Sequence, residues 1–307
     1  MPFNLKELPN KPKRFVSGGR TCAGCCIPVL ARTILGATDK PIVACNATGC
    51  MEVTSSIYPF SSWNIPWIHS AFENAAATIS GVEAAFKALK RKGKITKDIK
   101  FIAFGGDGGT YDIGIQSLSG AMERGHDMLY VCYDNNAYMN TGNQRSSATP
   151  YGAATTTTPA GKVKQGKEEW RKDLVKIIAA HNIPYAAQAA VHNLADLYRK
   201  AEKALSIEGP TFITVLAPCT TLWKYPPEMT MQYSKLAVET KFWPLFEIEN
   251  GKLKVNYKPS KEIPVEEFLK GQGRFRHLFK PENKGMLEHI QKTINENWER
   301  LLREEGI

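Results

Sequence analysis

The chain has 307 residues, of which 43% are hydrophobic and 23% charged, enough apolar sequence to bury a substantial core in one large or two smaller domains. The formal net charge of +10 comes from Lys and Arg residues that alternate with acids, a scatter typical of a solvated basic surface that an acidic protein partner can also use, and it argues against nucleic acid. Neither an apolar leader nor a run of about 18 apolar residues is visible, so we expect a cytoplasmic protein without a membrane span.

Strands and helices are predicted to alternate along the chain. Residues 1–20, rich in Pro and Lys, are expected to form an extended N-terminal arm. The apolar run at 40–49 predicts a short buried strand, and apolar residues at helical spacing predict a helix over 68–89, in which Gly81 indicates close packing. The near-continuous apolar run at 99–106 predicts a strand covered on both faces. Further on, the pattern predicts a helix at 113–125, a strand at 127–135, a helix at 168–181, a strand at 185–191, a helix at 193–205 and a strand at 210–218.

This alternation predicts an α/β fold in which a parallel sheet carries helices on both faces. The loop at 136–167 is rich in Thr, Gly and Pro, and a loop of that length in a compact domain is usually functional. We expect a central domain over 21–224. Residues 225–307 are expected to form a C-terminal extension that serves as an interface segment and ends in an amphipathic helix at 285–304.

An aspartate and an asparagine follow two neighbouring predicted strands. Asp107 ends the first of them within GDGG, and Asn135 ends the second within DNN. Ligands bind at the carboxyl edge of open parallel sheets, and Asp and Asn oxygens are hard ligands suited to Mg²⁺. Gly106, Gly108 and Gly109 let the backbone approach a phosphate, and the following helix offers its N-terminal amides. Each stretch alone is an ordinary turn sequence, so it is the pair that favours a divalent cation bridging a diphosphate.

This strand–GDG–helix–strand–NN pattern resembles the thiamine diphosphate motif, in which an Asp, an Asn and a backbone carbonyl two residues further on hold the metal ion. The resemblance implies that Asp107, Asn135 and the carbonyl of Ala137 bind Mg²⁺. It also implies a thiamine diphosphate-binding fold, in which the cofactor contacts a set of residues around these ligands: Gly49, Cys50, Gly106, Asp107, Gly108, Gly109, Asn135, Ala137, Asn140 and Thr141.

Seven cysteines stand at positions 22, 25, 26, 45, 50, 132 and 219. In a reducing compartment a disulfide framework is not expected, so metal binding or plain burial must account for them. Cys22 and Cys25 form a CxxC motif, which serves zinc, iron–sulfur clusters and dithiols alike, and spacing alone does not choose between these. A thiamine site adds a reason for a cluster, because thiamine chemistry on a 2-oxo acid leaves electrons that a nearby cluster can accept one at a time.

Longer stretches resemble one family. NATGCMEV, PWIHSAFENAAA, GDGGTYDIG, YDNNAYMNTGNQRSSATPYGA and GQGRFRHLF are similar to the β, thiamine-binding subunit of the 2-oxoacid:ferredoxin oxidoreductases, the pyruvate enzymes especially. The resemblance covers residues 16–280 and implies that Cys22, Cys25, Cys50 and Cys219 bind one [4Fe–4S] cluster. It assigns no role to the other three cysteines, two of which lie in predicted strands.

The resemblance implies oxidative decarboxylation of a small 2-oxo acid, with electrons passing through the cluster to ferredoxin; for pyruvate, coenzyme A takes the acetyl group. It implies an α subunit that contacts substrate and supplies the glutamate that activates thiamine, and γ and δ subunits that carry further clusters. Glu73 is interpreted as a helix residue, so this chain has no strong candidate for that glutamate. Asn140 matches the asparagine that faces the reacting end of thiamine, where it can donate a hydrogen bond to charge developing on the substrate oxygen.

Two positions depart from the pyruvate enzymes. Cys219 is followed by TTLW where PTGW is usual, and Asn143 stands where Ile or Gly is usual. An amide can bond a second carboxylate, and leaving it buried without a partner is costly. Asn143 is therefore a second candidate catalytic residue, under the hypothesis that the substrate is oxalate, which would give two CO₂ without coenzyme A. Drift at a position that does not touch substrate accounts for Asn143 equally well.

Two other classes of protein compete with this interpretation. A cluster-free thiamine lyase would lack the iron and acid-labile sulfide that four sulfur ligands predict. A zinc-stabilised binding module would use Cys22, Cys25 and Cys50, but it leaves the GDG–NN pattern and the long polar loop without an explanation.

Overall fold

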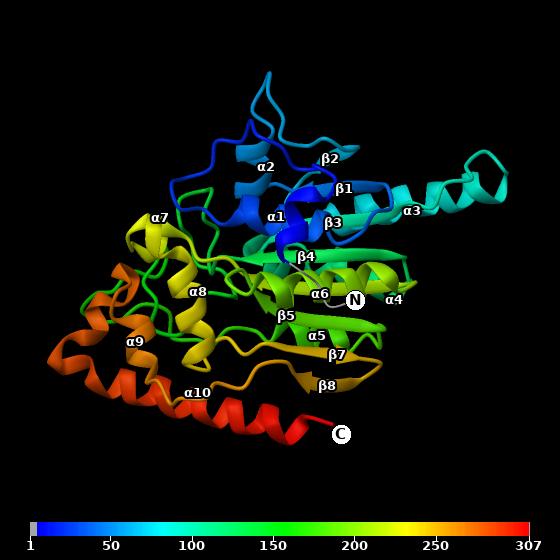
Figure 1. Ribbon diagram of the computed structural model, residues 1–307. Helices are drawn as coiled ribbons and strands as arrows, with labels where there is room; N and C mark the ends of the chain where they lie inside the picture. Colours follow the sequence, from blue (N-terminus) through cyan, green and yellow to red (C-terminus); the bar gives the residue numbers. More distant parts are fainter. Residues whose placement is uncertain (1–4, 307) are drawn as a thin grey trace.

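Figure 1 shows the computed structural model of the chain, which describes residues 5–306. Its eight strands form a single sheet in the order β2-β1-β3-β4-β6-β5-β7-β8. The strands are β1 (Ile42–Ala47), β2 (Trp67–Ser70), β3 (Lys100–Gly106), β4 (Met128–Asp134), β5 (Tyr185–Ala190), β6 (Pro210–Leu216), β7 (Phe246–Glu249) and β8 (Lys252–Val255).

The first six strands run parallel to one another, as the sequence predicts for an α/β fold. β7 pairs antiparallel with β5, and β8 antiparallel with β7. Residues 225–307 therefore contribute two strands to the main sheet and do not form a separate layer. Because β5 is paired on both sides, its backbone groups are satisfied without solvent.

Helices cover both faces of the sheet. The helices are α1 (Ile27–Leu35), α2 (Cys50–Ser55), α3 (Ala75–Arg91), α4 (Ile115–Glu123), α5 (Leu174–Ala179), α6 (Leu194–Ser206), α7 (Thr220–Trp223), α8 (Thr230–Glu239), α9 (Val265–Leu269) and α10 (Lys284–Glu304). Short 3-10 helices span Leu5–Asn10, Pro227–Met229, Gly273–Phe279 and Pro281–Asn283, and a π-helical turn spans Gly108–Asp112. None of the helices described is both long and apolar enough to cross a bilayer.

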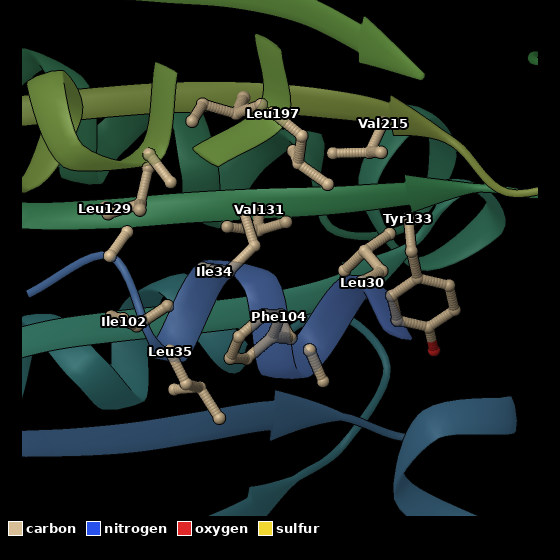
Figure 2. Close-up of a cluster of buried hydrophobic side chains, with 14 of the residues drawn as sticks. Leu30, Ile34, Leu35, Ile102, Phe104, Leu129, Val131, Tyr133, Leu197 and Val215 are labelled. Atoms are coloured by element: carbon tan, nitrogen blue, oxygen red, sulfur yellow. The ribbon is translucent and has the colours of Figure 1, made fainter. Parts of the chain in front are cut away.

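Alternate residues of the buried strands pack against opposite helix layers. Ile102 and Phe104 of β3 lie in the cluster that contains Leu30 and Ile34 of α1, as Figure 2 shows. Their neighbours along β3 face the cluster built with α3, α4 and α5. Burying each such side chain contributes roughly 1.5–3 kcal/mol to the free energy of unfolding, so the two apolar layers hold the sheet in place.

A third apolar cluster joins the C-terminal segment to the sheet. Its largest members are buried aromatic residues from α7, α9 and the segments around them: Trp223, Tyr225, Trp243, Phe268 and Phe275. In Figure 1 the helices α7, α8 and α9 gather at one end of the sheet, and α10 runs along the outside of the β7–β8 hairpin. The C-terminal segment therefore contributes buried side chains to the core of the protein.

Three local predictions differ from the structure. Residues 68–70, expected as the start of a helix, belong instead to β2, because Ile68 aligns with Cys45 in a parallel pair with β1. The 3-10 turn near the N-terminus and the buried Phe15 replace an extended arm, since the Arg14 guanidinium donates to the Leu35 carbonyl at 2.6 Å and anchors this stretch to the end of α1. α1 itself has no counterpart in the prediction.

Two further differences concern helices. α5 begins only at Leu174, where the Asp173 side chain accepts a hydrogen bond from the Lys176 N–H at 3.3 Å and caps the first turn. Gly81, expected to mark close packing, is exposed in α3, and a Cβ added there would meet nothing within 4 Å. The glycine is therefore tolerated by the helix without being required by a neighbour.

Candidate functional site

Four adjacent strands deliver the predicted site residues to one edge. β1, β3, β4 and β6 are consecutive in the sheet and parallel, so the loops that follow them lie side by side. Cys50 begins α2 after β1, Asp107 follows β3, Asn135 follows β4, and Cys219 stands three residues after β6. The alignment of strands alone brings these four residues together.

A first cavity opens at the ends of β1, β3 and β4. Every residue that the thiamine resemblance predicts to contact the cofactor lines this cavity, except Asp107. Asp107 is fully buried directly behind the wall. The rest of the lining was not singled out by the sequence and consists of Thr48, Phe72, Tyr133, Tyr138 and Met139. Asn140 and Thr141 are exposed in this chain.

Three groups that can supply oxygen ligands converge behind the cavity. The Asn135 side-chain amide lies 2.8 Å from Asp107 Oδ1 and 2.9 Å from the Ala137 carbonyl oxygen, and with its nitrogen on that side it donates a hydrogen bond to both. Turned over, the amide would present its oxygen at the same two distances. In an octahedral Mg²⁺ site with bonds of 2.0–2.1 Å, neighbouring ligand oxygens stand about 2.9 Å apart. Both spacings therefore fit neighbouring ligands of such a site once the amide oxygen faces the ion.

Burial makes the two acids of this region costly to ionise. Burial raises the pKa of the Asp107 carboxyl well above its ordinary value, and the neighbouring Asp134 carboxyl raises it further. Ser146 Oγ donates to Asp107 Oδ2, and the Asn135 N–H donates to Asp107 Oδ1 at 3.3 Å. Two adjacent buried carboxyls without a bound cation are an unfavourable arrangement, and a divalent ion would relieve it.

Asp134 fixes the turn that carries Asn135. The Asn136 N–H and side-chain Nδ2 donate to Asp134 Oδ1 at 3.0 and 2.6 Å, and Tyr111 Oη donates to Asp134 Oδ2 at 2.8 Å. Asn136 itself has a φ of 69°, a left-handed conformation that Asn tolerates better than most residues. The second asparagine of the DNN sequence therefore shapes the turn, and the first one faces the site.

At two of the glycines, an adjacent aromatic side chain leaves no room for a Cβ atom. A Cβ on Gly108 would stand 2.4 Å from the Tyr138 ring, and a Cβ on Gly49 would stand 2.6 Å from Tyr133 Oη. The sequence predicted that glycines here let a phosphate approach the backbone. The structure adds a second reason, because these aromatic side chains pack directly over the glycine backbone.

A second cavity, of about 200 Å³, is lined by Cys22, Cys25, Cys50 and Cys219. Burial, together with the neighbouring thiols, raises the pKa of Cys25 to about 11 and that of Cys50 to about 12. Among residues 5–306, no three His, Cys, Asp or Glu side chains are grouped so as to hold a single metal ion. The four thiols therefore surround a space and do not meet at a point.

The CxxC loop is tied to the C-terminal segment. Gly24 has a φ of 73°, and a Cβ there would lie 2.4 Å from the Pro227 carbonyl oxygen. Thr230 Oγ1 donates to the Gly24 carbonyl at 2.7 Å, and Thr220 Oγ1 donates to the Ala23 carbonyl at 3.2 Å. These contacts hold the loop against the segment that follows Cys219. The remaining cysteines, Cys26, Cys45 and Cys132, are buried among apolar side chains.

The two cavities share a wall. Cys50, Asn135, Met139 and Asn140 line both of them. Asn143 lines neither: it has a φ of 66° in the same loop, and its side-chain oxygen is buried without a hydrogen-bond partner. The wall between the cavities is therefore formed by the loops after β1 and β4.

Two residues that support the site escaped the sequence interpretation. The Trp223 indole N–H donates to the Asn135 carbonyl at 3.0 Å, and Arg274 Nη1 donates to Asn136 Oδ1 at 3.1 Å. Arg274 belongs to the GQGRFRHLF stretch, which was noted only as part of a resemblance. An arginine inside a stretch that resembles the family was the only sequence signal that Arg274 could support the site.

Comparison with known proteins gives a consistent result. Residues 47–215 match the family described as thiamine pyrophosphate enzyme, C-terminal TPP binding domain. Over 92% of this chain, the sequence is 58% identical to pyruvate synthase subunit PorB of Methanocaldococcus jannaschii, covering 94% of that protein. It is 51% identical to pyruvate synthase subunit PorB of Thermotoga maritima, over 100% of this chain and 98% of the relative.

Two further matches extend the comparison. Ketoisovalerate oxidoreductase subunit VorB of Pyrococcus abyssi is 47% identical over 98% of this chain and 97% of its own length. Among solved structures, a 2-oxoglutarate:ferredoxin oxidoreductase from Magnetococcus marinus superposes with a TM-score of 0.59 at 19% identity, covering 88% of this chain and 96% of the matched chain. At that identity the likeness concerns the fold alone.

Proposed function

Because this chain belongs to the PorB and VorB subunits of the ferredoxin-linked 2-oxoacid oxidoreductases, we propose that it is the subunit that holds thiamine diphosphate, Mg²⁺ and one [4Fe–4S] cluster. The reaction we propose is oxidative decarboxylation of pyruvate with coenzyme A, giving acetyl-CoA and CO₂ and passing electrons to ferredoxin. The observation that carries this proposal is the wall common to the two cavities, formed by Cys50, Asn135, Met139 and Asn140. Sites that share a wall are close enough for direct electron transfer.

The residues behind the first cavity fit a cation and a diphosphate. Asp107, Asn135 and the Ala137 carbonyl would hold Mg²⁺, since the Asn135 amide lies 2.8 and 2.9 Å from the other two oxygens, the spacing of neighbouring ligands. The backbone of Gly106, Gly108 and Gly109 would face the phosphates from the end of β3. Gly49 and Thr141 line the opposite side.

The four thiols fit a cluster better than a single zinc ion. In a tetrahedral zinc site with Zn–S bonds of about 2.3 Å, the sulfur atoms stand about 3.8 Å apart and converge on one point. The thiols of residues 22, 25, 50 and 219 instead surround a cavity of about 200 Å³, and no group of three ligands within the described part of the chain is arranged for one ion. A cluster places four iron atoms between its cysteines and needs such a space.

Thiamine diphosphate, when bound, supplies the electron sink that makes decarboxylation of a 2-oxo acid possible. The residues of this chain bind and orient it. Asn140, on the shared wall, would donate a side-chain N–H to charge developing on the substrate oxygen. Met139 is 8% exposed and would keep water from the same place.

Other chains are part of the proposal. Asn140 and Thr141 are exposed here, so a second subunit would cover the mouth of the first cavity. We assign to that α subunit the glutamate that activates thiamine, and to γ and δ subunits the further clusters that lead to ferredoxin. The basic balance of the chain, with a formal net charge of +10, suits an acidic partner.

Pyruvate is favoured over oxalate as the substrate. The oxalate hypothesis rests on Asn143 reaching the substrate, and Asn143 lines neither cavity. Two of the relatives described above carry the name pyruvate synthase. No contact of Asn143 in this chain supports a second substrate carboxylate.

The test uses the complex that contains this chain, purified without oxygen. Ferredoxin reduction is measured with pyruvate plus coenzyme A, and separately with oxalate alone, and iron and acid-labile sulfide are determined on the same material. We expect reduction with pyruvate and none with oxalate. Reduction by oxalate without coenzyme A would replace the substrate assignment, and the absence of sulfide would remove the cluster.

A further inference from the structure

Trp223 makes a hydrogen bond toward each of the two sites. Its backbone N–H donates to the Cys219 carbonyl at 3.1 Å, because Cys219 stands immediately before the single turn of α7 that Trp223 ends. Its indole N–H donates to the Asn135 carbonyl at 3.0 Å. One fully buried residue therefore links the loop that carries a proposed cluster ligand, through its backbone, to the loop that carries a proposed cation ligand, through its side chain.

Arg274 holds Trp223 from the other side. Its guanidinium carbon lies 3.8 Å from the centroid of the indole, and its Nη1 donates to Asn136 Oδ1 at 3.1 Å. Arg274 Nε donates to Gln272 Oε1 at 2.8 Å, while Nη2 is buried and has no hydrogen-bond partner among residues 5–306. A Cβ on Gly273 would stand 2.7 Å from Lys224 Cβ, so the turn before Arg274 presses directly on the end of α7.

We propose that Trp223, held in place by Arg274, is a positioning residue that couples the four-cysteine site to the cation site. This inference rests on the proposed function, since it requires both sites to be real. Both side chains are fully or almost fully buried, and packed interiors transmit displacement because no free volume absorbs it. When Cys219 is held by the cluster, α7 is fixed, and Trp223 in turn fixes the carbonyl of Asn135. The side-chain amide of Asn135 then stays beside Asp107 and the Ala137 carbonyl.

The chain contains a matched control for this contact. Trp243 is also fully buried, and its indole N–H donates to the Ala189 carbonyl at 2.8 Å. Arg171 lies over that ring at 4.1 Å, as Arg274 lies over Trp223. Trp243→Phe therefore removes the same kind of hydrogen bond from the same kind of stack, but the bond it removes ends on β5 and not on the Asn135 turn, and Arg171 keeps its bond to Tyr111.

The experiment is a double-mutant cycle on the assembled complex, with Mn²⁺ as the probe of the cation site. Binding of Mn²⁺ in the presence of thiamine diphosphate is followed by the EPR signal of the free ion. Four complexes are compared: wild type, Cys25→Ala, which removes a cluster ligand outside α7, Trp223→Phe, and the combination. Coupling appears as a failure of the two effects to add.

We expect Cys25→Ala to weaken Mn²⁺ binding in the wild-type background and to have no further effect in the Trp223→Phe background. Trp223→Phe alone should raise the Kd for Mn²⁺ about 3- to 10-fold, the range that corresponds to loss of one buried hydrogen bond. Trp243→Phe should leave that Kd unchanged. If Trp223→Phe does not assemble, Arg274→Lys serves in its place, with a smaller rise in Kd and the same loss of coupling.

Each outcome decides one point. Equal effects of Cys25→Ala in both backgrounds, or the same Kd for Trp223→Phe and Trp243→Phe, would overturn the coupling. If the proposed function itself is wrong, the result differs: Mn²⁺ binding by the wild-type complex is then absent or is unchanged by Asp107→Asn.

Discussion

The side-chain amide of Asn135 lies 2.8 Å from a carboxylate oxygen of Asp107. The two residues come from neighbouring parallel strands, and both are buried. An amide and a carboxylate so placed can hydrogen-bond to each other, and they can also direct their oxygens at one cation when the amide turns over.

Asp107→Asn keeps the shape of the side chain and removes its negative charge. We expect the affinity for Mn²⁺ or Mg²⁺ to fall more than about 100-fold, and the affinity for thiamine diphosphate to fall with it, because loss of a direct ligand exceeds the 10- to 100-fold effect of second-sphere changes. Isothermal titration of the complex with the cofactor and cation measures both. Asp98→Asn, at an exposed acid paired with Lys40, is the control. Equal affinities in the two variants would contradict the site.

Asn140→Ala should reduce kcat about 100- to 1,000-fold while leaving the Kd for thiamine diphosphate unchanged, because a donor to the substrate oxygen acts on the transition state. Asn143→Ala, three residues further along the same loop, should have little effect on kcat, since Asn143 lines neither cavity. Steady-state ferredoxin reduction measures both. A comparable loss in Asn143→Ala would restore that residue to the substrate and would reopen the oxalate hypothesis.

The cysteines should divide into two groups by iron content. Serine at position 22, 25, 50 or 219 should remove the [4Fe–4S] signal from this subunit, because these thiols line one cavity. Cys45→Ser should retain it, since Cys45 lies within β1 and is packed in the apolar core. EPR of the dithionite-reduced complex and iron analysis are the measurements. Retention of the signal in Cys219→Ser would show that another residue completes the cluster.

Gly108→Ala should weaken cofactor binding, whereas Gly81→Ala should stabilise the fold. At Gly108 the new Cβ would stand 2.4 Å from the Tyr138 ring, so the cavity wall must shift and the Kd for thiamine diphosphate should rise. At Gly81 nothing lies within 4 Å of the new Cβ. That change should stabilise α3 by about 0.5–1 kcal/mol, because Ala loses less backbone entropy than Gly. Thermal unfolding and cofactor titration of both variants distinguish the effects.

His192 predicts a change of stability with pH. Burial lowers its pKa to about 4, and the nearby Lys235 acts in the same direction. The ordinary value is 6.5, so the unfolded chain binds a proton over the interval in which the folded chain does not. The contribution of neutral His192 to the free energy of unfolding is therefore fully present above about pH 6.5 and is lost as the pH falls toward 4. His192→Asn should reduce this acid sensitivity, measured as the difference in unfolding temperature between the wild-type and variant complexes at pH 7 and pH 5. An identical pH dependence in both would exclude His192 as the cause.

Elements set by neighbouring residues were predictable from the sequence, and elements set by contacts between distant residues were not. β3 and β4 were predictable because an apolar run followed by GDG or DNN is a local signal, and the parallel pairing then places Asp107 beside Asn135. β2 was not predictable, because four residues with a helical pattern become a strand only through pairing with β1. The position of Asn143 relative to the cavities was not predictable, because a loop sequence does not encode which of its side chains reach a cavity, and Asn143 lines neither one.

The contribution of the C-terminal segment was also beyond local patterns. Trp223 and Arg274 act through contacts with residues 88 and 138 positions earlier in the chain. No periodicity or motif encodes contacts of that separation. The prediction of an interface extension over 225–307 therefore omitted the two strands of this segment and the contact of Arg274 with Asn136, while Trp223 lies just before the segment.

The contact between Arg274 and Asn136 has a consequence for biosynthesis. Translation proceeds from the N-terminus, and the earlier parts of a chain generally begin to fold first. The ribosome has synthesised all the proposed ligand residues once it adds Cys219. Arg274, which hydrogen-bonds the DNN turn, is added 55 codons later. A nascent chain released early from the ribosome, or halted in between, would carry every liganding atom and still lack the last support. Loading with metal and cofactor should accordingly be an event of the finished polypeptide, which pulse-labelled ribosome-bound intermediates can be used to examine.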